Sequence, residues 1–132
     1  MARGFEGQID TWCNGDYASV FYYYIISGWI PTQNVLAMRS GLKRSNKTAN
    51  FNVALVWRLV EETSEAVDNG DWAATPDENA ISTTDAVFKQ FYDATTAIGN
   101  KRYCQFALKV WNYTGSAFNI GQIEYSVELR GA

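Results

Sequence analysis

The chain contains no histidine, the residue that most often serves as a general base or as a metal ligand. Its absence also removes the usual partner of a serine or cysteine nucleophile. The remaining candidates for acid–base chemistry are carboxylates, which gather between positions 61 and 85. Two carboxylates facing each other across a cleft hydrolyse glycosidic bonds. Acidic residues also populate exposed loops without any chemistry, and the sequence favours a protein that is not an enzyme and has no catalytic residue.

Calcium is the other use for these carboxylates, because Ca²⁺ prefers oxygen ligands. Asp68, Asn69, Gly70 and Asp71 lie in succession within the acidic segment. They lack the alternate acidic positions of an EF-hand loop, and turn formation explains them equally well. We therefore expect no cofactor and no metal site, with a structural ion in the acidic loop as an alternative.

Aromatic residues are the best signal for binding, with five Trp, eight Tyr and seven Phe in 132 residues. Tyr103 and Trp111 alternate with the apolar Cys104, Phe106 and Leu108, so we expect them on the solvent-exposed face of a strand. Exposed aromatics stack against sugar rings, form a second core layer or contact another protein. The sequence favours core or protein interface, and the candidate interface or ligand residues are Trp12, Trp72, Tyr103 and Trp111.

Alternation of apolar and polar residues predicts the strands that position these side chains. The clearest strands are 102–112 and 119–130, which a turn around Gly115 would join in an antiparallel hairpin. Residues 51–60 alternate in the same way, although a helix over 54–67 is an alternative. Residues 17–30 are continuously apolar and aromatic, which is typical of a strand covered on both faces.

The remaining segments are less regular. Residues 35–38 predict a short strand, and residues 39–50 predict a polar loop that carries Arg39, Lys43, Arg44 and Lys47. This basic loop could meet the acidic 61–85 segment of a neighbouring copy. Residues 84–99 fit either an amphipathic helix that ends at Gly99 or a short strand.

Together these elements predict an all-β fold, an antiparallel β-sandwich or jelly roll with one short helix, and α+β is the alternative class. We expect an irregular N-terminal arm over residues 1–16, in which residues 8–12 could form a short edge strand, and one sandwich domain over residues 17–132. Cys104 is expected as a buried thiol, and a disulfide with Cys13 is the alternative if the protein ends up outside a cell.

The composition limits the partners. A net charge of −3 and a pI near 4.8 argue against nucleic-acid binding, which needs a basic face. No apolar run is long enough for a membrane helix, and the N-terminus lacks the apolar region of a signal peptide. We therefore expect a protein made in the cytoplasm that has neither a membrane nor a nucleic acid as partner.

The segment 101–115, from Lys101 to the Asn112-Tyr113-Thr114-Gly115 turn, precedes a final strand that ends at Gly131. This pattern resembles small β-sandwich proteins of tailed-phage particles, such as head decoration proteins and tail components. The resemblance implies a non-enzymatic structural protein of the virion, with itself and other virion proteins as partners. Carbohydrate-binding sandwiches share a similar pattern, so a carbohydrate-binding module with exposed Trp and Tyr is the alternative function.

Overall fold

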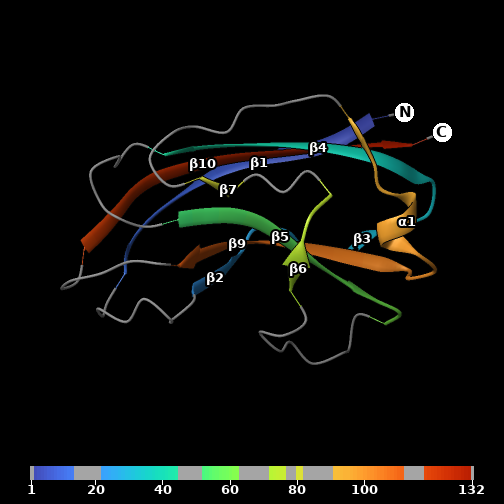
Figure 1. Cartoon of the computed structure of the whole chain (residues 1–132), viewed down its shortest axis with the longest axis horizontal. Coiled ribbons are helices and arrows are strands. Elements are labelled where there is room, and N and C mark those ends of the chain that lie inside the picture. The colour runs from blue at the N-terminus through green and yellow to red at the C-terminus, as the bar shows by residue number, and fades with distance from the viewer. Residues whose placement is uncertain are drawn as a thin grey trace.

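The computed structural model describes residues 2–13, 22–44, 52–62, 72–76, 80–81, 91–111 and 118–131. In these residues two antiparallel sheets pack face to face, and one short helix lies at one end of the molecule (Figure 1). The predicted all-β sandwich is confirmed. Among the described residues, no helix is long and apolar enough to cross a membrane.

Sheet A contains four strands in the order β1, β10, β4, β8. The long strand β10 (Phe118–Gly131) lies between β1 (Ala2–Cys13) and β4 (Val35–Arg44). The short β8 (Tyr92–Asp93) adds to the far side of β4 at Ala37 and Met38. Because Ala2 pairs with Arg130, the two ends of the chain lie side by side (Figure 1).

Sheet B has β9 (Tyr103–Trp111) and β5 (Asn52–Val60) at its centre. On the outer side of β9 lie β2 (Tyr22–Ile25) and then β3 (Ile30–Pro31). On the outer side of β5 lie β6 (Ala73–Ala74) and β7 (Ala80–Ile81). The strand predicted over 51–60 is thus confirmed, and the helix is ruled out for residues 54–60.

The predicted hairpin between the last two strands is wrong. Both strands exist, but β9 belongs to sheet B and β10 to sheet A, so the chain crosses between the sheets after Trp111. The apolar faces of β9 and β10 therefore belong to opposite walls of one core. Alternation indicates which face of a strand is buried, but it does not indicate which strand is its neighbour.

The core fills the space between the sheets and is built from the alternate positions of the four long inner strands. Phe106, Leu108 and Val110 of β9 are fully buried, and so are Ile123 of β10 and Met38 of β4. Cys104 belongs to this cluster and is buried, as expected. The other buried members are Val35, Leu42, Val53, Leu55, Trp57, Ala94, Ile98, Val127 and Leu129.

Strand β1 differs from the irregular arm expected over residues 1–16, because twelve of these residues pair with β10. Gly4 and Gly7 hide the first half of this strand from a pattern search, and the strand requires the first of these glycines. At Gly4 the two backbones approach so closely that an added Cβ would lie 2.5 Å from the carbonyl oxygen of Val127. Glycine is the residue that allows such an approach.

Three other expectations need correction. The strand expected at 35–38 continues to Arg44, so Arg39, Lys43 and Arg44 lie on β4 and not in a loop; Lys47 lies outside the described residues. The strand expected over 17–30 is described only as β2 and β3, with an exposed Ile25. In segment 84–99 the described part holds both β8 and a single helical turn, α1 (Thr95–Ile98), which ends as expected at Gly99 with φ of 57°.

Candidate interaction surface on the outer face of sheet B

The outer row of β9 is much less exposed than the alternation predicts. Gln105 and Ala107 are buried, while Tyr103, Lys109 and Trp111 are half-buried. On the neighbouring strand β5, the outward residues Ala54, Val56 and Arg58 are buried as well. This part of sheet B is therefore covered on both faces, and its outer face carries a second layer of packed side chains.

Arg58 is the centre of that layer, although only 3% of its surface is exposed. Its guanidinium carbon lies 4.5 Å from the ring centroid of Trp29 and 5.5 Å from that of Trp72. Its Nε donates a hydrogen bond of 3.1 Å to Oε1 of Gln105. The amide of Gln105 in turn donates to the Ser27 carbonyl at 3.2 Å, which ties the loop after β2 to the layer. A buried cation is thus held by aromatic faces and by a hydrogen-bonded chain.

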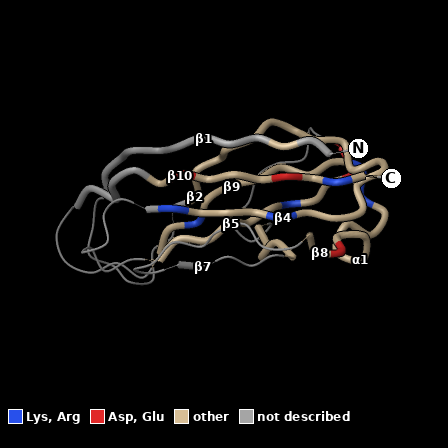
Figure 2. Tube along the Cα trace, turned by 90° about the horizontal axis from the view of Figure 1, so that it is seen from above, with Lys and Arg blue, Asp and Glu red and all other residues tan. Residues whose placement is uncertain are grey.

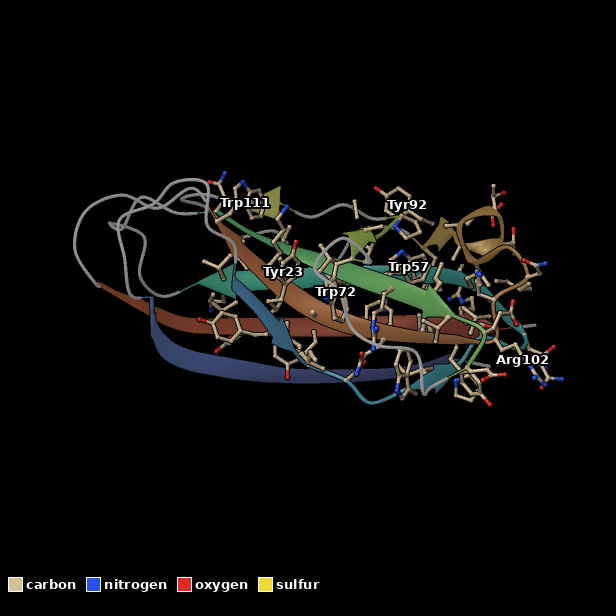
Figure 3. The ribbon with its side chains drawn as sticks, turned by 90° about the horizontal axis from the view of Figure 1, so that it is seen from below. Tyr23, Trp57, Trp72, Tyr92, Arg102 and Trp111 are labelled. Atoms are coloured by element: carbon tan, nitrogen blue, oxygen red, sulfur yellow. The ribbon has the colours of Figure 1, made fainter. Side chains whose placement is uncertain are left out.

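Trp72 is a core residue, because it is 8% exposed and packs on Val56 and Ala107. Its ring stacks on Tyr23 with centroids 6.0 Å apart and planes at 17° (Figure 3). Burial raises the pKa of the Tyr23 hydroxyl, because the phenolate is poorly solvated there. The ring of Trp72 is therefore buried in protein contacts, and it does not form an open platform for a sugar. We call Trp29, Arg58, Trp72 and Tyr23 the aromatic layer.

The exposed remainder of this face lies around the aromatic layer. Trp111 lies at the end of β9, away from Trp72 (Figure 3), and Lys109 Nζ lies 5.0 Å from its ring centroid. Ile25, which pairs with Ala107, is 53% exposed. Tyr103 lies at the opposite end of β9, where it pairs with Pro31 and Val60. Tyr103 and Trp111 thus lie on the same face of β9 but eight residues apart. The aromatic layer covers the part of this face that lies between them.

Trp12 lies on the other sheet. Its backbone pairs with Asn119 in sheet A, next to an irregularity in register between Thr11 and Trp12. Of the four predicted residues, three lie on the outer side of sheet B and one belongs to a strand of sheet A. They do not converge on one site.

A second cluster, not foreseen from the sequence, covers part of sheet A. Arg130 Cζ lies 3.9 Å and Arg39 Cζ lies 4.6 Å from the ring centroid of Phe91. Arg39 also forms an ion pair with Glu128 at 2.7 Å, in line with the direct pairing of these residues across β4 and β10. Acidic and basic positions lie close together on these strands (Figure 2). The cluster anchors Phe91, the residue before β8. The only signal for this cluster in the sequence is that charged residues occupy alternate positions in the segments that form β4 and β10.

The acidic segment contributes little to the described structure. Glu61 and Glu62 follow β5, while the other acidic residues of 61–85 lie outside the described residues. In the described part of the chain, no group of three or more Asp, Glu, Cys or His residues is placed to hold a metal ion.

Comparison with known proteins finds a likeness in fold only. No model of a known protein family matches the chain, and no curated protein matches it. Among solved structures, the chain is similar to one from infectious bursal disease virus strain Gx, with a TM-score of 0.52 and 12% identity over 100% of this chain and 38% of that one.

A second similar structure is the crystal structure of the VP2 subviral particle of infectious bursal disease virus. The TM-score is 0.60 and the identity is 12%, over 98% of this chain and 33% of that one. The chain therefore spans well under half of the length of these viral chains. The likeness shows that the chain shares a sandwich fold with part of these viral proteins.

Proposed function

We propose that the chain is a structural, non-enzymatic component of a virus particle that acts through protein–protein contacts. The observation that supports this is the fit of 98% of the chain, at a TM-score of 0.60, to part of a protein that forms a subviral particle. Fold alone does not determine function, so the proposal also needs a surface that suits assembly.

The outer face of sheet B is such a surface. It exposes Ile25 and part of Trp111 beside a buried aromatic layer. Aromatic residues and apolar anchors on a preorganised base are typical of the centre of a protein interface. Partners of this kind are copies of the same chain and other virion proteins.

A finer proposal is a role as a head decoration protein or tail component of a tailed phage, located in the virion. It is supported by the resemblance of residues 101–131 to such proteins. A carbohydrate-binding role is disfavoured by the burial of Trp72, because this ring was one of the four candidates for stacking on sugar.

The test is a measurement of mass in solution over a wide concentration range, with a glycan-array screen on the same sample. We expect concentration-dependent self-association and no glycan binding. Trp111→Ala and Ile25→Ser should weaken association at least tenfold, because both remove apolar contact area. Tyr92→Ala is the matched control, since Tyr92 is a 37% exposed aromatic on sheet A. A strict monomer that binds glycans would overturn the proposal.

A further inference from the structure

Strand β1 is the outermost strand of sheet A, and it is 12 residues long. One side pairs with β10 along nearly its whole length, and no other strand of the described residues pairs with β1. It runs along one margin of the molecule (Figure 3). A long edge strand presents a row of backbone N–H and C=O groups that can pair with another strand.

We propose that β1 pairs antiparallel with β1 of a second copy around a two-fold axis. This would join two four-stranded sheets into one continuous sheet of eight strands. Antiparallel neighbours in one sheet share faces, so a position on the core side must lie opposite another position on the core side. Successive residues alternate between the two faces, so an axis halfway between two residues would place core positions opposite outward positions. The axis must therefore pass beside one residue, which then lies opposite the same residue of the second copy.

Among axes at the three neighbouring positions 6, 7 and 8 near the middle of the strand, the sequence of β1 favours one. With the axis at Glu6, two glutamates lie directly opposite each other; with the axis at Gln8, Glu6 lies opposite Asp10. Like charges in such positions are destabilising. With the axis at Gly7, Glu6 lies opposite Gln8 and Phe5 lies opposite Ile9. This register separates the acidic residues and pairs two of the three large apolar residues of the strand.

The pairing in β1 and β10 agrees with this choice of faces. Phe5 and Ile9 pair with Val127 and Ile123, both of which are buried in the core. Glu6 pairs with Ser126, an outward position of β10. The register centred on Gly7 thus continues the core face of sheet A across the axis, and keeps polar positions on the outer side.

The test of this register is a pair of cysteine variants. Glu6→Cys and Gln8→Cys are made separately in a Cys13→Ser background, mixed and oxidised gently. Residues directly opposite each other in antiparallel strands have the Cα separation that a disulfide needs. We expect a mixed disulfide dimer that forms faster than either homodimer. Gly28→Cys is the control, because a side chain there meets open space in an exposed loop.

A second test uses charge and does not depend on cysteine. Gln8→Glu should raise the dissociation constant of the dimer roughly tenfold, because it creates two symmetry-related pairs of opposed glutamates. The double variant Glu6→Gln with Gln8→Glu restores one acid opposite one amide and should restore affinity. In both variants the new carboxylate at position 8 lies opposite Glu124 of the same chain. Repulsion between these two carboxylates is therefore equal in the two variants and cancels when their dissociation constants are compared.

Three outcomes would overturn the pairing: a monomer at all concentrations, mixed cross-linking no faster than with Gly28→Cys, or equal affinities for Gln8→Glu and the double variant. The pairing is independent of sheet B. If Trp111→Ala abolishes larger assemblies while the β1 dimer persists, both proposals stand. If the β1 dimer forms and neither Trp111→Ala nor Ile25→Ser weakens any association, the assembly role proposed for the outer face of sheet B fails and the β1 pairing stands.

Discussion

The most informative perturbation is Arg58→Ala, because one side chain connects the aromatic layer to the sheet. Arg58 is almost fully buried, so solvent screens its interactions little. Each of its two ring contacts, with Trp29 and Trp72, contributes about 1–2 kcal/mol when desolvated. The charged hydrogen bond to Gln105 contributes about 1.5–3 kcal/mol. These contributions share atoms and are not additive, so we expect a loss of about 3–5 kcal/mol in the free energy of unfolding.

The measurement is urea unfolding, followed by both tryptophan fluorescence and far-ultraviolet circular dichroism. Lys109→Ala is the matched control on the same face, since Lys109 is half-buried and contacts one ring at 5.0 Å; its cost should stay below about 1 kcal/mol. Arg58→Lys keeps the charge and loses the planar fork, and it should fall between the two. A cost for Arg58→Ala equal to that of Lys109→Ala would refute the view that Arg58 organises this layer.

Two further predictions concern sheet A and the turn after β8. Gly4→Ala should destabilise the chain by about 1–3 kcal/mol in thermal unfolding, because the new methyl group would lie 2.5 Å from the Val127 oxygen; an unchanged Tm would show that β1 shifts freely. Two hydrogen bonds to the Asp93 carboxylate lower its pKa below the ordinary 3.8. The hydroxyl of Thr95 donates the one with the larger effect, and the backbone N–H of Thr95 donates the other. The resulting stabilisation is present above pH 3.8 and is lost as the pH falls through the lower folded value. Thr95→Ala should bring the pKa of Asp93 back toward 3.8, which an NMR titration measures. A pKa that stays low in this variant would exclude the Thr95 hydroxyl as the main cause.

Periodicity predicts the individual strands well, because each long strand has one face against the same core. The strands β5, β9 and β10 all lie where alternation places them, and Phe106 and Leu108 are buried as expected. Alternation does not encode pairing, and this is why the predicted hairpin is wrong. The sheet to which a strand belongs depends on long-range contacts that no local pattern contains.

The candidate site was predictable only in part, for a related reason. Tyr103 and Trp111 lie on the outward row of β9, but the burial of Gln105 and Arg58 depends on Trp72 and Trp29, which come from segments distant in sequence. Because residues 39–44 are rich in basic side chains, the sequence predicts a loop where the structure has the second half of β4. On the strand, Arg39 pairs with Glu128 of β10 and Lys43 pairs with Glu124.

The pairing of Ala2 with Arg130 determines how the fold responds to tension. Force applied between the chain ends would act across β1 and β10 at the last pair of the ladder, in the direction of the hydrogen bonds. The bonds would then break one pair after another, as in unzipping, and not all together as in shear. The sandwich should therefore yield at low force when pulled by its ends, and resist much more strongly when pulled along β10.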